Sequence, residues 1–222
     1  MYAAALFDLD GTLIDTEPRS QEAWSRLFRS HAVPYDDAII RGFAGRPARE
    51  ALGDHVHRFS GRTVDELFAE AIHYTTLADM PAVDTVPGAL ELVSRLRASG
   101  VPVGLVTSGT REYARHELDA LGALHLFDVM VTADDVARGK PDPQGYLAGC
   151  AALGVEPSAT VVFEDAPAGV AAAKAAGARC IAISAGQPHE ALAAADLIVP
   201  DLTDIAWPPR FRPVAAVTGS EG

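Results

Sequence analysis

Two aspartates stand one residue apart directly after a short apolar run near the N-terminus. The segment ALFDLDGTLIDTEP carries Asp8 and Asp10, and Gly11 follows the second of them. Residues two apart in an extended segment point to the same side, and a glycine then permits a sharp turn. Two carboxylates this close both remain ionised only when a cation lies beside them. The pair therefore indicates a cation-dependent site at the end of a strand.

Three further polar clusters follow apolar runs along the chain. Ser108 and Gly109 come after PVGLVT, Lys140 lies in RGKPDP, and Glu164 and Asp165 end TVVFED. Ligands of open α/β sheets bind outside the carboxyl ends of the strands. We therefore expect these clusters to meet the two N-terminal aspartates at one edge of a sheet.

The side chains in these clusters suit a metal and a phosphate group. Four carboxylates in one place require a divalent cation, and oxygen-only ligands favour Mg²⁺ over zinc. The Ser108 hydroxyl and the backbone N–H of Gly109 precede a predicted helix, whose N-terminus attracts anions. Lys140 can supply a positive charge to a phosphate oxygen or to an aspartate.

Each of these residues also has an ordinary structural interpretation. Asp10 with Gly11 is a common turn pair, and Ser108 or Asp165 could cap a helix. Lys140 could be a solvated loop residue. The occurrence of all four clusters at predicted strand ends, in a chemically complementary set, favours the functional interpretation.

Short apolar segments alternate with helical patterns over most of the chain. Parallel strands covered on both faces lack polar alternation, which fits 3–8, 102–108, 128–132, 160–165, 179–184 and 197–199. Helices are predicted over 88–100, 110–122, 143–154 and 167–177, each ending in a glycine. This alternation predicts an α/β fold, a doubly wound parallel sheet of the Rossmann-like kind.

One long segment interrupts the alternation. Residues 16–83 contain no convincing strand, and helical patterns cover 17–31, 35–43, 47–61 and 64–78. We predict a small inserted helical cap domain over 16–83, joined by two linkers that could act as a hinge. The α/β catalytic core would then comprise 1–15 and 84–206. A loosely packed tail is predicted over 207–222, anchored at Trp207.

Composition and charge narrow the class of protein. The chain has 222 residues, of which 49% are hydrophobic, and its net charge is −12. So acidic a chain is a poor candidate for non-specific binding to nucleic acid or to anionic membranes. The N-terminal apolar run is too short for a signal or a membrane span, so we expect a cytoplasmic protein. Cys150 and Cys180 have no metal-type spacing and are predicted to be buried free thiols.

The four motifs together resemble those of the haloacid dehalogenase-like hydrolase superfamily. The matching segments are DLDGT, VTSGT, GKPDP and FEDAPAG, in that order. The helical insert after the first strand looks like the small cap of that family, and the resemblance covers about residues 1–200. Closest in pattern are the sugar-phosphate and glycerol-phosphate phosphatases and the β-phosphoglucomutases.

The resemblance implies a role for each motif residue. Asp8 would be the nucleophile that forms an aspartyl-phosphate, and Asp10 the general acid and then the general base. Asp8, the backbone carbonyl of Asp10 and Asp165 would bind Mg²⁺, with Glu164 bound directly or through water. Dehalogenases lack the second aspartate, so Asp10 favours phosphate chemistry. The residues that would bind the transferring phosphoryl group are Ser108, Gly109 and Lys140.

Arginines in and near the insert are candidates for substrate binding. Pro47 is typical of a first helical position, which would place Arg46 and Arg49 at the positive end of a helix dipole. A local rule broken in this way points to function, although Arg49 could instead pair with Glu50 or another acid. Arg111 lies where the family's mutases often have a lysine for a second phosphate, and could equally be an exposed residue of its helix.

The leading hypothesis is a Mg²⁺-dependent phosphatase that acts on a small sugar or polyol phosphate, a small phosphorylated metabolite. The alternative is a phosphosugar mutase of the β-phosphoglucomutase type, which would hand the same phosphoryl group to a second sugar hydroxyl. A non-catalytic binder that has kept the fold is a third class, against which the complete set of motif residues speaks. Nothing in the sequence demands more than a monomer.

Overall fold

A six-stranded parallel sheet forms the centre of the computed structural model, which describes residues 2–44, 48–184 and 187–211. In spatial order the strands are β5 (Val129–Val131), β4 (Val103–Val106), β1 (Ala4–Phe7), β6 (Thr160–Glu164), β7 (Arg179–Ile183) and β8 (Leu197–Val199). All five pairings are parallel. The predicted doubly wound α/β fold is confirmed, and its six strands lie within a few residues of their expected positions.

Helices cover both faces of the sheet, and successive residues of β1 alternate between them. Phe7 joins a core cluster with Leu92 and Leu118, which belong to α5 (Ala89–Ala98) and α6 (Arg111–Ala120). Leu6 joins a second cluster with Tyr146 and Val170, from α7 (Gln144–Leu153) and α8 (Pro167–Ala175). Because both faces are buried, the interior residues of the strands are apolar, and polar residues such as Glu164 stand at strand ends.

The predicted helix stops are confirmed, and short 3₁₀ turns lie between the main elements. Gly100, Gly122, Gly154 and Gly177, predicted to end the four helices, all have positive φ angles. The 3₁₀ turns are η1 (Val56–Arg58), η2 (Leu124–Leu126), η3 (Ala133–Asp135), η4 (Pro157–Ala159) and η5 (His189–Leu192).

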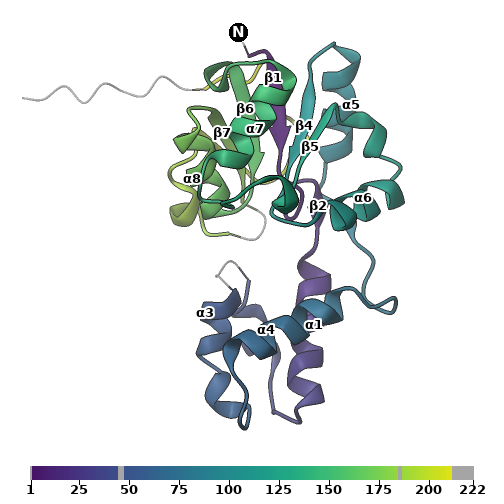
Figure 1. The fold of residues 1–222 in the computed structure, drawn as a ribbon, viewed down its shortest axis with the longest axis vertical. Helices are drawn as coiled ribbons and strands as arrows, with labels where there is room; N and C mark the ends of the chain where they lie inside the picture. The colour runs from purple at the N-terminus through teal and green to yellow at the C-terminus, as the bar shows by residue number, and fades with distance from the viewer. Residues whose placement is uncertain (1, 45–47, 185–186, 212–222) are drawn as a thin grey trace, which may run out of the picture.

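The insert between β1 and β4 forms a separate group of helices that lies beside one end of the sheet (Figure 1). The group contains α1 (Glu17–Ser30), α2 (Asp37–Arg41), α3 (Ala48–Gly53) and α4 (Val64–Thr75). It has its own core, in which Phe28 and Phe43 pack with Phe59 of the following turn. The single helix expected over 47–61 is shorter, because α3 ends at Gly53, and its predicted start at Pro47 lies outside the described residues.

Two short strands join the helical group to the core. β2 (Ile14–Asp15) pairs in antiparallel fashion with β3 (Asp84–Thr85), where the chain leaves the core and where it returns. Strands of two residues are too short to show any periodicity, so the sequence did not predict them. We propose that these paired linkers mark the two ends of the cap domain predicted over 16–83.

A buried ion pair also connects the cap to the core. The Arg19 guanidinium of α1 donates to Glu117 of α6 at 2.6 Å and to the backbone carbonyl of Pro81 at 3.2 Å. Glu117 is only 5% exposed. A buried carboxylate needs such a partner, so this contact restrains the position of α1 against α6.

Several smaller predictions can be compared with the structure. Cys150 and Cys180 are buried free thiols, as expected. Trp207 packs against the core near Tyr2, at 6.5 Å between ring centroids, while 212–222 of the predicted tail lie outside the described residues. Within the ranges that the structure describes, no helix is both long and apolar enough to cross a membrane.

The Asp196 carboxylate is held in the core by charged hydrogen bonds. Its carboxylate, 8% exposed, accepts hydrogen bonds from Lys174 and Arg179, each at 2.6 Å, and from the backbone N–H of Cys180 at 2.8 Å. Burial by itself raises the pKa of Asp196, but these three donors hold that pKa below its ordinary value of 3.8.

We expect Asp196→Asn to lower the free energy of unfolding by about 1.5–3 kcal/mol at neutral pH, since charged hydrogen bonds are lost. A carboxyl with a depressed folded-state pKa stabilises above its unfolded-state pKa and loses that contribution as pH falls through the folded-state value. The difference from the parent in urea unfolding should therefore be full at neutral pH and shrink below about pH 4. Exposed Asp119→Asn is the control, and a gap that persists undiminished in acid would contradict the prediction.

Candidate active site

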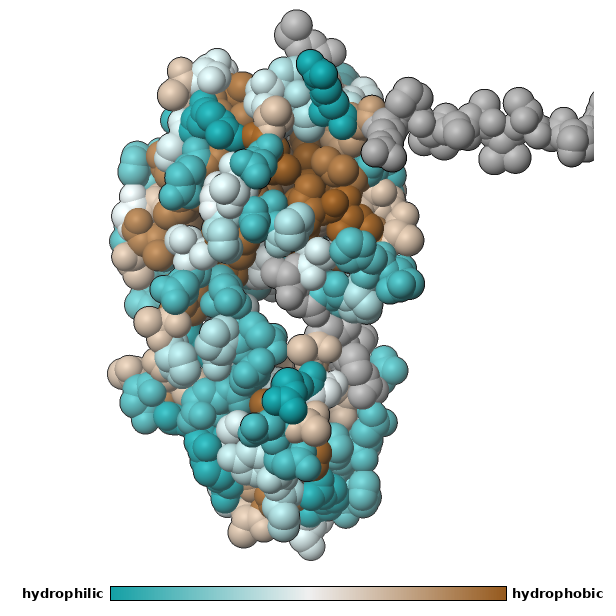
Figure 2. Space-filling model, turned by 180° about the vertical axis from the view of Figure 1, so that it is seen from behind, coloured by the Kyte–Doolittle hydropathy of each residue, from teal (hydrophilic) through white to brown (hydrophobic). Residues whose placement is uncertain are grey.

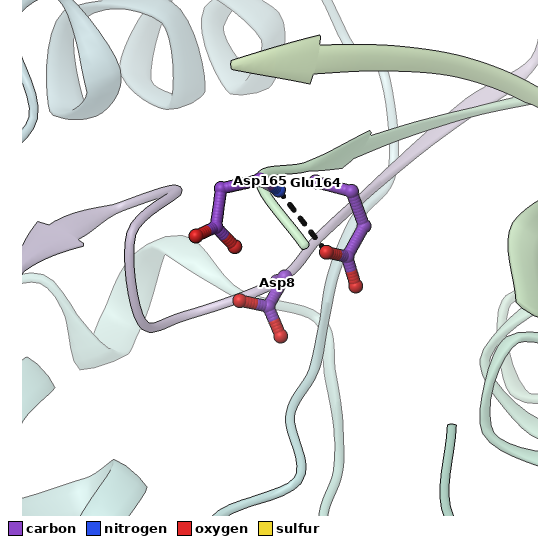
Figure 3. Close-up of side chains that lie close together, drawn as sticks. All are labelled: Asp8, Glu164 and Asp165. Carbon is purple, nitrogen blue, oxygen red and sulfur yellow. Dashed lines mark hydrogen bonds between the residues drawn. The ribbon is translucent and has the colours of Figure 1, made fainter. Parts of the chain in front are cut away.

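The predicted carboxylates meet at the carboxyl edge of the sheet, where the strand order reverses. β1 and β6 are neighbours there, so Asp8, one residue past β1, lies beside Glu164 and Asp165 at the end of β6. Their carboxylate oxygens lie within 4.8 Å of one another. Figure 3 shows the three carboxyl groups facing the same space. The sheet topology thus produces the cluster that the sequence predicted, since ligand sites form at such switch points.

Lys140 lies inside this cluster rather than in solvent. Its ammonium donates to the Asp8 carboxylate, to Glu164 Oε1 at 2.6 Å and to the carbonyl of Val106 at 3.1 Å. The lysine side chain is only 12% exposed. Burial alone lowers the pKa of Lys140, but Asp8 and Glu164 hold that pKa above its ordinary value. The lysine is therefore a fixed positive charge, and its alternative role as a solvated loop residue is excluded.

The Glu164 carboxylate accepts hydrogen bonds at both of its oxygens. Its side chain has no exposure, and its Oε1 accepts the Tyr146 hydroxyl at 2.6 Å in addition to Lys140. Its Oε2 accepts the backbone N–H groups of Asp165 and Ala166, at 3.1 and 3.2 Å. So many donors keep Glu164 in one orientation, with Lys140 directed at Asp8.

The cluster carries more negative charge than Lys140 balances. Burial raises the pKa of Asp8 to about 8 against the opposing charge of Lys140. Burial also raises the pKa of Asp165 well above its ordinary value, and the charges of Asp8 and Glu164 add to that effect. A further cation at this point would restore the ionised carboxylates. The all-oxygen donor set fits a hard divalent ion.

Two glycines let the site pack this closely. Gly11 has φ +79°, and a Cβ placed there would lie 2.1 Å from Asp165 Oδ2. A Cβ at Gly169 would lie 1.7 Å from Glu164 Oε1. Neither position can hold a side chain unless a carboxylate moves, which explains the glycine in DLDGT and the one in FEDAPAG.

Ser108 and Gly109 lie at the start of α6, as predicted. The N-cap is Thr110, whose hydroxyl accepts the backbone N–H of Tyr113 at 3.3 Å, so Ser108 is not used as the cap. Likewise Ala166, not Asp165, occupies the N-cap position of α8. Neither Ser108 nor Asp165 therefore serves as a helix N-cap, which was the alternative interpretation of both residues.

A cavity of about 680 Å³ lies between the core and the cap. The core contributes Asp10, Ser108, Gly109, Thr110 and Tyr113 to its lining, and the cap side contributes Thr16, Arg19, Ser20, Phe68, Ile72, Thr75 and Thr76. Figure 2 shows the molecule hollowed between its two parts. Asp10 is thus the predicted carboxylate that faces the space a substrate would occupy.

Two of the predicted substrate arginines, Arg49 and Arg111, form ion pairs with other carboxylates than those of this cluster. Arg46 lies outside the described residues. Arg49 pairs with Asp65 at 3.0 Å and covers the ring of Phe68 at 3.9 Å from its centroid. Arg111 donates to Asp135 at 2.6 Å. Substrate binding by these arginines stays a prediction. Arg49 contacts Phe68, a residue that lines the cavity.

Three residues of the site were not predicted. Tyr113 donates its hydroxyl to Asp10 Oδ1 at 2.6 Å, Tyr146 supports Glu164, and Arg19 lines the cavity. A tyrosine in a helical pattern looks like any core aromatic, so sequence alone offered no signal for Tyr146. Tyr113 could have been noticed, because the first turn after Ser108 lies close to the predicted anion site.

The close contact at Gly11 leads to a prediction with a matched control. Gly11→Ala should add about 1–2 kcal/mol of left-handed backbone strain and displace the Asp165 carboxylate. Gly61, with φ +70° and open space around it, should show only the strain when changed to alanine. We therefore expect added Mg²⁺ to raise the melting temperature of the parent and of Gly61→Ala, but not that of Gly11→Ala. Equal metal responses in the two variants would contradict this view of the site.

Comparison with known proteins agrees with this geometry. Validoxylamine A 7'-phosphate phosphatase of Streptomyces hygroscopicus subsp. limoneus is 58% identical over 94% of this chain and 98% of its own length. Hexitol phosphatase A of Escherichia coli K12 is 38% identical, covering 90% of this chain and 91% of that protein.

Solved structures show the same architecture. CbbY of Rhodobacter sphaeroides in complex with xylulose-(1,5)bisphosphate has a TM-score of 0.73 at 25% identity, covering 93% of this chain and 97% of that one. The sequence model of the haloacid dehalogenase-like hydrolase family matches residues 2–177 of this chain. That range includes all four carboxylates and Lys140. The chain therefore belongs to the haloacid dehalogenase-like hydrolase family.

Proposed function

We propose that this hydrolase is a Mg²⁺-dependent phosphatase that cleaves a small sugar or polyol phosphate through an aspartyl-phosphate on Asp8. The observation that carries the proposal is the buried Asp8 carboxylate, in contact with Lys140 and beside a set of oxygens suited to a metal. Two relatives named as phosphatases of phosphorylated carbohydrates or related compounds support it.

Asp8 and Asp165 would hold the metal, with the backbone carbonyl of Asp10 and with Glu164 directly or through water. Bound Mg²⁺ would neutralise charge on the phosphoryl group during transfer. The rest of the chemistry depends on the chain's own residues. Lys140, fixed by Glu164, would offset charge on Asp8 and on the phosphoryl oxygens.

In the first step an Asp8 oxygen attacks phosphorus and the bond from phosphorus to the substrate oxygen breaks. Asp10 donates a proton to the departing alkoxide, which leaves as an alcohol. In the second step water attacks the phosphorus of the aspartyl-phosphate while Asp10 accepts a proton from that water. Breaking the bond to Asp8 then releases inorganic phosphate and restores the Asp8 carboxylate.

The cavity supports a substrate with both polar and apolar surface. Its core side carries Asp10 and Ser108, whereas the cap side presents Phe68 and Ile72. Ile72 is 48% exposed although it is a large hydrophobic residue. Exposed apolar side chains that face a polar site are suited to the C–H faces of a sugar or cyclitol.

The mutase alternative uses the same Asp8 phosphoenzyme but transfers the phosphoryl group to a second sugar hydroxyl. It would require a ligand for a second phosphate, and the Arg111 guanidinium is already bound to Asp135. This contact favours hydrolysis. A non-catalytic role is disfavoured because Lys140 and the carboxylates remain in contact.

The proposal is tested by release of inorganic phosphate from glucitol phosphate, fructose phosphate, glycerol phosphate and nitrophenyl phosphate with Mg²⁺. We expect turnover of at least one of them, and a loss of about 10³-fold or more in kcat for Asp8→Asn, because the nucleophile is removed. Analysis of the sugar products detects isomerisation. Isomerised sugar phosphate without net phosphate release would overturn hydrolysis in favour of the mutase, and equal activity of Asp8→Asn would remove both.

The cap wall provides a separate prediction about affinity. Ile72→Ala should raise KM for sugar phosphates about 3- to 10-fold, since part of an isoleucine's burial energy of about 1.5–3 kcal/mol is lost. The kcat value should change little, because Ile72 belongs to the cap side of the cavity and carries no group that takes part in the reaction. Leu147, 42% exposed on α7, is the matched control. An unchanged KM in Ile72→Ala, or an equal rise in Leu147→Ala, would exclude contact between Ile72 and the substrate.

A further inference from the structure

Tyr113 occupies a defined position beside the predicted general acid. It stands in the first turn of α6, where its backbone N–H is bound by the Thr110 hydroxyl. Side chains of a helix lean toward its N-terminus, and the ring of Tyr113 accordingly lies against Gly109. A Cβ at Gly109 would approach the Tyr113 ring to 2.7 Å, so glycine is needed there. The ring is thus held on one side by the backbone of the serine motif.

The Tyr113 hydroxyl donates a hydrogen bond of 2.6 Å to Asp10 Oδ1. The two residues are 103 positions apart in the sequence and both line the cavity between core and cap. Among the described residues, no other side chain is hydrogen-bonded to the Asp10 carboxyl group. Without this bond, rotation of Asp10 about its side-chain torsions would be limited by packing alone.

We propose that Tyr113 is a positioning residue for Asp10. Its hydroxyl fixes Oδ1 and so leaves Oδ2 directed to exchange a proton with the leaving oxygen or with water. The inference rests on the proposed function, because it assumes that Asp10 transfers protons. It goes beyond the four motifs, since Tyr113 belongs to none of them.

The same helix also connects this position to the cap. Glu117 lies one turn after Tyr113 on α6 and pairs with Arg19 of α1 at 2.6 Å. Arg19 lines the cavity together with Asp10 and Tyr113. The cap therefore restrains α6, the helix that carries Tyr113. Through Tyr113 this restraint also fixes the position of Asp10 relative to the cap side of the cavity.

The role predicts a dependence on the leaving group. An alkoxide is a poor leaving group, so cleavage of a sugar phosphate needs the proton from Asp10. Nitrophenolate leaves as a stable anion, so formation of the same aspartyl-phosphate from nitrophenyl phosphate does not need that proton. Loss of Asp10 positioning should therefore affect the first substrate class far more than the second.

The experiment compares kcat/KM of the full-length parent and Tyr113→Phe, with Mg²⁺, on nitrophenyl phosphate and on whichever of glucitol, fructose and glycerol phosphate is hydrolysed fastest. We expect a loss of about 10- to 100-fold on the sugar or polyol phosphate, a part of the contribution of general acid catalysis. The loss on nitrophenyl phosphate should be below about 3-fold. A purely structural role would lower both values by the same factor.

Two variants make the outcome interpretable. Tyr74→Phe removes a comparable hydrogen bond, from the Tyr74 hydroxyl to Glu70 at 2.7 Å within the cap, and should show no difference between the substrates. Asp10→Asn removes the proton donor itself and should show a larger difference than Tyr113→Phe. Melting temperatures of all variants establish that they are folded.

The possible failures separate the two proposals. If Asp10→Asn discriminates between the substrates but Tyr113→Phe loses the same factor on both, the positioning role is wrong and the proposed function stands. If Asp10→Asn also fails to discriminate, or the parent hydrolyses none of the compounds, the proposed function itself is wrong. Discrimination by Tyr74→Phe equal to that by Tyr113→Phe would likewise overturn the specific role of Tyr113.

Discussion

The contact of the Lys140 ammonium with Asp8 and Glu164 is the interaction on which the site depends. Burial and the neighbouring charges of Glu164 and Asp10 raise the pKa of Asp8, and the charge of Lys140 acts against this rise. Lys140 supplies this charge in a position where it is 12% exposed and hydrogen-bonded on three sides. The remaining negative charge makes the site suitable for a divalent cation.

The topology of the sheet makes this contact possible. Asp8 follows β1 and Glu164 ends β6, more than 150 residues later, and the two strands are direct neighbours. The loop after β5 brings in Lys140 from a third element. Asp8 and Glu164 lie at the ends of buried strands, where the backbone is fixed by the sheet, whereas Lys140 reaches them from a loop. Rigid elements hold a reactive carboxylate more precisely than mobile loops can, and the close approach at Gly11 shows how little free space remains.

The cap and α6 supply most of the lining of the cavity beside the sheet edge. The sheet edge presents the carboxylates and Lys140, while the cavity between core and cap is lined on its far side by Phe68 and Ile72. Arg19 and Glu117 join the two sides through a buried ion pair. One helix, α6, therefore follows the Ser108–Gly109 loop, contacts Asp10 in its first turn and contacts the cap one turn later. α6 thus contacts both a carboxylate of the core and the cap.

The sequence by itself determined the parallel fold, the helical insert and the ordered set of polar residues at strand ends. It could do so because continuous apolar runs and terminal glycines are local signals, and because Asp8 and Asp165 stand at the ends of such runs. Only the tertiary structure decided that Lys140 is buried against Asp8, that Tyr113 holds Asp10, and that Arg49 pairs with Asp65. These contacts join residues from different elements, and a side chain's partner depends on packing that no local pattern records.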